Sequence, residues 1–370
     1  MPGKYEIAAY YFPQWHPDPN NETRKGKGWS EWVSMKAAKP RFPGHEQPKI
    51  PVWGYLDESD PKVSEKQIDA AADHGIDIFL YDWYWDMGRT EKDGGPFLHR
   101  ALENGFLKAG NRDRMKFALM WANHNEVNAE RFGAMADYIV EKYLRCPNYW
   151  KVKGGLFFCI YEMHTLINGL GGTEETKKAL DGFREKVSAA GLPPLHINGM
   201  EWGMQKHHMA IGDSPNELAA YLGVESVTSY VWIHNIEMEG FPEEPYDNVA
   251  KKAPALWERI RDDFDVVYFP NVTMGWDPSP RVDESWPYDP DTKEGLVYPK
   301  TAILTGNTPE AFEKSLKDAK AYLDKYNDSP KVVTLYAWNE WTEGGYLEPE
   351  QTHGMGYLEA IRNVFGGEGK

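Results

Sequence analysis

Residues 332–345 read Val-Val-Thr-Leu-Tyr-Ala-Trp-Asn-Glu-Trp-Thr-Glu-Gly-Gly, and the rest of the chain is organised around this stretch. It begins as a short apolar run, 332–337, whose length and composition are typical of a buried strand. Glu340 and Glu343 follow it, three residues apart and flanked by Trp338 and Trp341, and two glycines come after them. Glycine can adopt the backbone angles of a tight turn. The stretch therefore predicts a strand that ends in a binding or catalytic site.

The same pattern recurs along the whole chain, where apolar runs of strand length alternate with helical patterns. Eight strands are predicted, at 7–12, 76–81, 116–121, 156–161, 195–198, 227–232, 266–270 and 332–338. The helical patterns that follow them lie at 64–74, 97–109, 129–144, 174–190, 214–222, 246–264, 309–326 and 355–364. Near-continuous apolar strands indicate an all-parallel sheet covered on both faces. We therefore expect an α/β fold, a single (β/α)8 TIM barrel that forms one catalytic domain over residues 1–370.

Two predicted connections are too long to be simple turns. Residues 13–63 follow the first strand, and residues 271–307 follow the seventh. Long loops without helix or strand usually have a function. In a barrel of this kind both lie on the carboxyl face, where active sites are built.

Composition excludes several classes of function. The net charge of −16 repels phosphate backbones and argues against a nucleic-acid partner. No apolar run reaches the roughly 18 residues of a membrane span. The first residues lack the apolar core of a signal peptide, which favours the cytoplasm, although a periplasmic or secreted chain trimmed of its leader would begin in the same way. Cys146 and Cys159 are expected to be free thiols, and no Cys/His spacing indicates a metal site.

Side chains suited to sugar binding gather where six of the predicted strands end and in the loop after the seventh. Aromatic rings stack on the apolar faces of a sugar, and Asp, Glu, Asn and His hydrogen-bond its hydroxyls. The predicted substrate-binding residues are Tyr11, His16, Asp82, Trp83, Trp121, Asn123, His124, Tyr161, Glu162, Tyr230, His234, Trp276, Asp277, Asn339 and Trp341. Packing or capping explains any one of them alone equally well. Their repetition at the same end of the strands favours a common site for a glycan.

Two carboxylates close together suit the cleavage of a glycosidic bond. The reaction needs an acid that protonates the departing oxygen and a second group that stabilises or attacks the developing cation. Neighbouring carboxylates push their pKa values apart, so that one is protonated while the other is ionised. Glu340 and Glu343 are the predicted catalytic pair; the alternative for Glu343 is a capping or ion-paired acid. An acidic substrate also stays open, because Arg41, Arg89 and Arg281 lie in loops that can face the pocket.

Residues 339–344, Asn-Glu-Trp-Thr-Glu-Gly, resemble the Asn-Glu-Trp-x-Glu-Gly signature of glycoside hydrolase family 99, the endo-α-mannosidases and endo-α-mannanases. The chain is more similar still to the WbsX-like branch of that superfamily. The further matching segments, in chain order, are 9–16, 26–32, 38–40, 44–48, 121–123, 156–161, 275–277 with Arg281, and 346–349. The resemblance implies a barrel without a cofactor that cleaves an α-linked, mannose-like sugar with retention.

The resemblance also implies a role for each glutamate. The residue that matches Glu340 acts as a base on the 2-hydroxyl of the sugar, which attacks the anomeric carbon to give a 1,2-anhydro intermediate; in the ordinary retaining reaction it would itself be the nucleophile. The residue that matches Glu343 is the general acid and then the general base for water. A 2-hydroxyl trans to the leaving group supplies the nucleophile by proximity.

Departures from the family pattern bear on the sugar. Thr342 stands where the endomannosidases carry histidine, and Asp82 with Trp83 replaces a Tyr-His pair of the WbsX-like branch. His124 stands where that branch commonly has glutamate, and Glu162 where it often has arginine. These changes should alter the hydrogen bonding of the pocket but leave the glutamate pair intact. The identity of the sugar is therefore left open.

Two other functions remain alternatives. Proteins of the WbsX-like branch are often labelled glycosyltransferases, and Asp289-Pro290-Asp291 can be read as a metal-binding Asp-x-Asp motif for a nucleotide sugar. However, no glycine-rich phosphate site at a helix N-terminus lies near it. A non-catalytic carbohydrate-binding barrel would share the aromatic residues but would not need paired glutamates. The sequence does not indicate an oligomeric state.

Overall fold

The structure is a computed structural model that describes residues 5–86, 95–205, 214–292, 296–326 and 330–366. Its centre is a parallel sheet in which the strands pair in the order β10-β8-β7-β6-β4-β2-β1-β13-β11. In chain order, these strands are β1 (Tyr5–Tyr11), β2 (Ile78–Asp86), β4 (Lys116–Trp121), β6 (Gly155–Ile160), β7 (Leu195–Met200), β8 (Ser226–Thr228), β10 (Val267–Phe269), β11 (Asn271–Thr273) and β13 (Lys331–Tyr336). Short antiparallel additions, β3 (Gly95–Phe97) and β5 (Lys151–Val152), extend β2 and β6.

The sheet closes on itself because β10 and β11 are two halves of one strand. Only Pro270 separates them: Phe269 pairs with Thr228 of β8, and Asn271 pairs with Thr334 of β13. Proline has no N–H to give to a ladder, so the regular pairing is interrupted at this residue. Its carbonyl still accepts a hydrogen bond of 3.0 Å from the Thr334 amide. The two ends of the sheet are thus joined, which confirms the predicted eight-stranded barrel.

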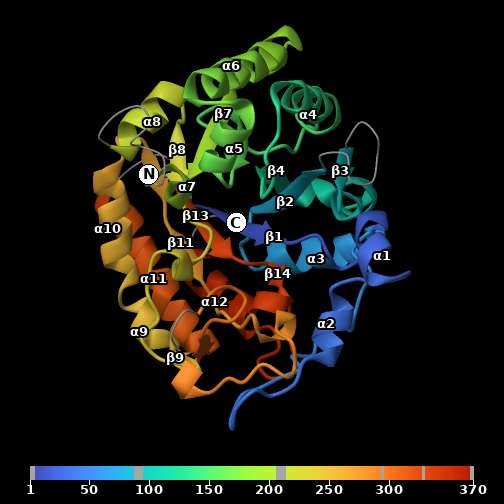
Figure 1. The fold of residues 1–370 in the computed structure, drawn as a ribbon, viewed down its shortest axis with the longest axis vertical. Helices are drawn as coiled ribbons and strands as arrows, with labels where there is room; N and C mark the ends of the chain where they lie inside the picture. Colours follow the sequence, from blue (N-terminus) through green and yellow to red (C-terminus); the bar gives the residue numbers. More distant parts are fainter. Residues whose placement is uncertain (1–4, 87–94, 206–213, 293–295, 327–329, 367–370) are drawn as a thin grey trace.

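Helices surround the strands on the outside (Figure 1). The long ones are α3 (Pro61–Asp73), α4 (Ala129–Lys142), α6 (Thr173–Ala189), α10 (Ala253–Asp263), α11 (Pro309–Tyr326) and α12 (Gly356–Phe365). Shorter ones are α1 (Pro19–Lys25), α2 (Trp32–Ala37), α5 (Met163–Leu170), α7 (Glu201–Gln205), α8 (Pro215–Leu222) and α9 (Tyr246–Ala250). In the described parts of the chain, no helix is both long and apolar enough to cross a bilayer.

The structure corrects two of the predicted helices. The segment 97–109 contains one turn of π-helix, Ala101–Gly105, and one of 3₁₀-helix rather than an α-helix. Gly105 passes so close to another segment that a Cβ atom there would lie 2.2 Å from a backbone oxygen of Glu58, so tertiary contact overrides the helical pattern. The predicted helix 246–264 is divided into α9 and α10. Pro254, in the first turn of α10, cannot continue a helix from before it.

The two long connections contain more regular structure than expected. The connection after β1 holds α1 and α2. The connection after β11 has a 3₁₀ turn at Ser279–Arg281 and leads to β12 (Ile303–Thr305), which pairs with β9 (Glu243–Pro245). These elements lie beside the barrel and fix the loops that reach its carboxyl end.

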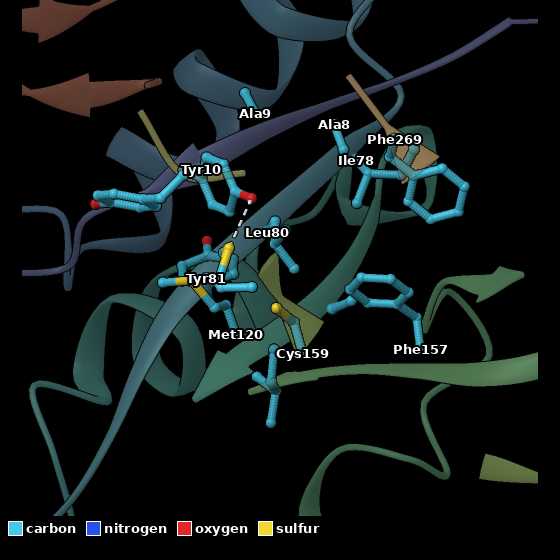
Figure 2. Close-up of a cluster of buried hydrophobic side chains, with 14 of the residues drawn as sticks. Ala8, Ala9, Tyr10, Ile78, Leu80, Tyr81, Met120, Phe157, Cys159 and Phe269 are labelled. Carbon is cyan, nitrogen blue, oxygen red and sulfur yellow. Dashed lines mark hydrogen bonds between the residues drawn. The ribbon is translucent and has the colours of Figure 1, made fainter. Parts of the chain in front are cut away.

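The interior of the barrel is filled by alternate side chains of the strands. Figure 2 shows Tyr10, Leu80, Met120 and Cys159 packed together from β1, β2, β4 and β6. Successive side chains of a strand point to opposite faces, so Asp82 follows Leu80 onto the inner face. Both cysteines are free, as predicted.

Candidate active site

Glu340 and Glu343 lie on a short hairpin after β13. Its strands, β14 (Asn339–Glu340) and β15 (Gly345–Tyr346), pair antiparallel, and Trp341–Glu343 form a single 3₁₀ turn between them. Side chains three residues apart are eclipsed in a 3₁₀-helix. Glu340 is the residue immediately before the turn and Glu343 is its last residue, and both carboxylates contact Arg281, so the two side chains point to the same side.

The turn is anchored to the loops after β1 and β11 through Asp277. The Asp277 amide donates a hydrogen bond of 2.6 Å to the carbonyl oxygen of Glu343. The Asp277 carboxylate accepts from His45 Nε2 at 2.8 Å and from Gln47 Nε2 at 2.6 Å. Gly344 completes the turn at φ 71°, and a Cβ atom there would lie 2.6 Å from the Asp277 nitrogen. Only glycine fits this backbone angle and this contact.

A cavity of about 810 Å³ contains both glutamates. The predicted site residues that line it are Asp82, His124, Tyr161, Glu162, Tyr230, His234, Trp276, Glu340 and Glu343. The residues lining it that were not predicted as site residues are Phe12, Gln14, Glu31, Tyr84, Met120, Ala122, Trp202, Ile233, Asn235, Arg281 and Tyr298. Alternation along β2 could have indicated Tyr84, which is two residues from Asp82. Arg281 was named from the sequence only as a loop residue that can face the pocket, and it does line the cavity.

Two further predicted residues, Trp121 and Asn123, line an adjoining cavity of about 200 Å³. The two cavities share several residues, among them Tyr84 and His124. The Asn123 side chain both donates to and accepts from the backbone of Glu162, at 2.7 Å in each case. Asn123 therefore fixes the end of β6, from which Glu162 reaches the main cavity.

Six predicted residues do not line either of these cavities: Tyr11, His16, Trp83, Asp277, Asn339 and Trp341. Tyr11 and Trp83 point outward from their strands and hydrogen-bond residues of the surrounding layer, Gln67 and Tyr143.

Asn339, His16 and Trp341 support the glutamate hairpin. Asn339 accepts a hydrogen bond of 2.7 Å from the Phe12 amide and donates to Glu58, whose carboxylate is also 3.2 Å from His16 Nδ1. Trp341 stacks on Tyr346, with ring centroids 4.0 Å apart. These contacts hold the backbone that carries Glu340 and Glu343.

Arg281 bridges the two glutamates. Its Nη2 lies 3.3 Å from Glu340 Oε2, and its Nη1 forms an ion pair with Glu343 Oε1. The Tyr298 hydroxyl donates to Glu343 Oε1 at 2.7 Å, and the Tyr336 hydroxyl donates to Glu343 Oε2. Glu343 thus accepts from three donors, whereas Glu340 contacts only one end of the guanidinium.

The surroundings of the two glutamates differ in a way that affects their protonation. Burial raises the pKa of Glu340 well above its usual range; the charge of Glu343 adds to this effect, and Arg281 opposes it. Glu343 differs from Glu340 in its contacts, because it accepts from Arg281, Tyr298 and Tyr336. The raised pKa favours a protonated Glu340 in the free protein. The family resemblance, by contrast, implies that Glu340 acts as a base.

The other charged groups of the predictions lie elsewhere. The Arg41 guanidinium donates to the carbonyl oxygens of Asp283 and Trp286, at 2.8 Å each, and does not line the main cavity. Arg89 is outside the described residues. Asp289 and Asp291 are exposed and do not line the cavity either. Within the ranges that the structure describes, no group of three His, Cys, Asp or Glu side chains converges as a metal site.

The family model described as Glycosyltransferase WbsX matches residues 7–131 and 126–361. This chain belongs to the WbsX family. The match confirms the WbsX-like resemblance that the motifs predict. A curated relative, the uncharacterized protein WxcX of Xanthomonas campestris pv. campestris (strain B100), is 25% identical over 385 residues, covering 97% of this chain and 49% of the relative. The chain thus spans about half the length of the curated relative, and the assignment of one domain to residues 1–370 stays a prediction.

Solved structures with a similar fold include glycosidases. A glycoside hydrolase-like protein superposes with a TM-score of 0.62 at 15% identity, covering 98% of this chain and 94% of that one. The glycoside hydrolase family 99 endo-α-mannosidase from Bacteroides thetaiotaomicron gives a TM-score of 0.57 at 14% identity, covering 97% and 96%. At these identities the likeness concerns the fold, which is one that carbohydrate-active enzymes use.

Proposed function

We propose that this WbsX-family chain is a retaining glycoside hydrolase that acts on an α-linked, mannose-like sugar in a glycan or polysaccharide. The observation that carries the proposal is the buried pair Glu340 and Glu343, joined by Arg281 in a cavity at the carboxyl end of the barrel. The fold shared with an endo-α-mannosidase supports the same class of reaction. So do the aromatic and amide side chains that line the cavity.

In the proposed reaction, Glu340 takes the proton of the sugar 2-hydroxyl as that oxygen attacks the anomeric carbon. Glu343 protonates the departing oxygen and later removes a proton from water. Attack by Glu340 itself is the other retaining route. In either case the two carboxylates must flank the anomeric carbon, Glu343 beside the departing oxygen and Glu340 on the opposite side of the ring.

The contacts of Arg281 set a condition on this assignment. Glu343 accepts hydrogen bonds from Arg281, Tyr298 and Tyr336. To act as the general acid, Glu343 must carry a proton when the glycan is bound. The proposed roles therefore require the bound glycan to displace Arg281 from Glu343.

Substitution of each glutamate tests the function and the roles together. Glu340→Gln and Glu343→Gln should each lower the hydrolysis of α-mannan oligosaccharides by about 10²- to 10⁴-fold. On an α-mannoside with an activated leaving group, only the variant that lacks the general acid should recover much of its rate, because the leaving group no longer needs a proton. Glu244→Gln, a buried carboxylate on β9 outside the cavity, is the matched control. Unchanged turnover in both glutamine variants would reject the proposal.

The family description favours a glycosyltransferase as the second candidate. Under that reading, Asp289 and Asp291 would hold a metal and a nucleotide sugar, although both side chains are exposed and outside the main cavity. Calorimetry with GDP-mannose and Mn²⁺ distinguishes the two functions. Tight binding that Asp291→Asn abolishes, without hydrolysis of any glycan, would favour transfer. Sugar binding without either reaction would leave a carbohydrate-binding barrel.

A further inference from the structure

Asp82 has one carboxylate oxygen in use and one without a partner. It comes from the inner face of β2 and lines the main cavity with only 2% of its surface exposed. Its Oδ2 accepts a hydrogen bond of 2.8 Å from the Tyr230 hydroxyl. Its Oδ1 is buried and has no hydrogen-bond partner among the described residues. Buried polar atoms nearly always have a hydrogen-bond partner in folded proteins. We therefore expect a bound molecule to supply the hydrogen-bond partner of this oxygen.

Asp82 is also close to the catalytic pair in electrostatic terms. The negative charge of Glu343 contributes to the raised pKa of Asp82, and Asp82 contributes in turn to that of Glu340. Burial is the largest cause at both residues. A molecule in contact with the two glutamates therefore lies within the same small region as Asp82.

The charges around the cavity restrict which sugar can enter. The acidic residues that line it are Glu31, Asp82, Glu162, Glu340 and Glu343. Among the described residues that line it, Arg281 is the one lysine or arginine, and both ends of its guanidinium contact the catalytic glutamates. Burial lowers the pKa of His124, so that imidazole adds no charge near neutral pH. Among the described residues that line the cavity, an anionic sugar would meet five carboxylates and one arginine that already contacts both glutamates.

We propose that Asp82 is a specificity-determining residue whose Oδ1 hydrogen-bonds one ring substituent of an uncharged sugar held beside Glu340 and Glu343. The proposal rests on the proposed function only in placing a sugar in the cavity. We expect uronic acids and sulfated or phosphorylated sugars to bind at this position less tightly than a neutral ring.

Binding rather than hydrolysis gives the sharper test. The probes are a sulfur-linked α-mannobiose that cannot be hydrolysed, its monodeoxy analogues at each ring hydroxyl, and its mannuronate counterpart. Asp82→Ala should weaken binding of the parent disaccharide by about 10- to 100-fold, as expected for one lost hydrogen bond to a buried group. For the one analogue that lacks the contacted hydroxyl, Asp82→Ala should weaken binding by only about threefold or less. The substitution and the missing hydroxyl remove the same contact, so their effects do not add.

The controls separate loss of contact from loss of fold. Asp82→Asn keeps the shape of the side chain and a hydrogen-bonding group in the same place, so it should retain more affinity than Asp82→Ala and discriminate against the same deoxy analogue. Glu244→Gln removes a buried carboxylate outside the cavity and should bind every probe as the native protein does. Thermal unfolding of each variant confirms that it is folded.

Three results would overturn the proposal: a weakening spread evenly over all analogues, mannuronate binding as tight as that of the neutral sugar, or no binding of any neutral probe. The outcome is distinguishable from a failure of the proposed function. Asp82-dependent binding of the probes without hydrolysis of the oxygen-linked disaccharide would reject the hydrolase and leave the role of Asp82 standing.

Discussion

The amide of Asp277 donates a hydrogen bond of 2.6 Å to the carbonyl oxygen of Glu343, and this contact ties the proposed general acid to a loop more than sixty residues earlier in the chain. The Asp277 side chain is held in turn by His45 and Gln47 from the loop after β1. Three loops of the barrel therefore determine where Glu343 stands. The first two predictions concern this arrangement.

Loss of the His45 imidazole should loosen the position of Glu343. His45→Ala leaves the buried Asp277 carboxylate with fewer donors, and a displacement of the acid by a fraction of an ångström should lower kcat by about tenfold or more. Steady-state kinetics on the same glycan measure the effect. The control is His353→Ala, which should leave kcat unchanged. His353 is half-buried and lines, together with His45, a separate cavity that does not contain the two glutamates. Equal kinetics in both variants would show that Asp277 does not need this anchor.

Gly344→Ala should be far more damaging than its backbone angle alone explains. A positive φ costs an alanine about 1–2 kcal/mol, and here the added Cβ would also lie 2.6 Å from the Asp277 nitrogen. Gly171→Ala is the matched control, because Gly171 has φ 91° and nothing within 4 Å of the added Cβ. Activity and thermal midpoints of the two variants should therefore separate. A Gly344→Ala protein as active as Gly171→Ala would contradict the close contact.

The pH dependence of hydrolysis should report the raised pKa of Glu340. A base must be ionised, and burial with the charge of Glu343 keeps Glu340 protonated to higher pH than an ordinary glutamate. The rate should therefore rise with pH along a limb that lies above the ordinary range of glutamate. Arg281 lowers the pKa of Glu340, so Arg281→Met should move this limb to still higher pH. A limb that moves to lower pH in the variant would refute the assignment, and profiles of kcat/KM measure it.

The phenol of Tyr298 contacts both Glu343 and Arg281, and its loss should impair the reaction. Tyr298→Phe removes a donor 2.7 Å from the carboxylate and should lower kcat/KM by about fivefold to fiftyfold, as for a hydrogen bond to a charged group. Tyr288→Phe is the control in the same loop, because the buried Tyr288 hydroxyl has no partner among the described residues. An effect of equal size in the two variants would indicate a general disturbance of the loop.

The buried Glu348 should make the free energy of unfolding fall as the pH rises. Burial raises its pKa from 4.5 to about 7, so between these values the unfolded chain loses a proton that the folded chain keeps. The free energy of unfolding should fall by up to about 3 kcal/mol across that window and stay level above it. Glu348→Gln cannot titrate and should remove this part of the fall, whereas the exposed Glu185→Gln should not. Urea unfolding at several pH values measures the difference.

The barrel was predictable because its signal is local. Apolar runs and helical periods are properties of short windows, and the strand at 116–121 and the helix at 309–326 coincide with β4 and α11. The helix predicted over 97–109 was wrong because a contact between Gly105 and a distant backbone segment decides the local conformation. Likewise, the break at Pro270 looks like the end of a strand, although the strand continues on a new partner.

The site was predictable only in outline for a related reason. A residue that follows a strand in the sequence is expected at the carboxyl end of the barrel. Whether its side chain points into the barrel depends on the alternation along the strand, and the side chains of Tyr11 and Trp83 point outward. The donors on Glu343 depend on where loops settle in three dimensions. Tyr298 carries no sequence signal that links it to a glutamate 45 residues later.

Arg281 and Tyr298 both come from the connection between β11 and β12, while the carboxylates that they contact belong to the hairpin of β14 and β15. The acids and their immediate electrostatic environment are thus encoded in separate stretches of the gene. A change confined to the connection can shift the working pH or the preferred glycan while the motif that carries the glutamates stays intact. Members of this family that share the motif need not share a substrate.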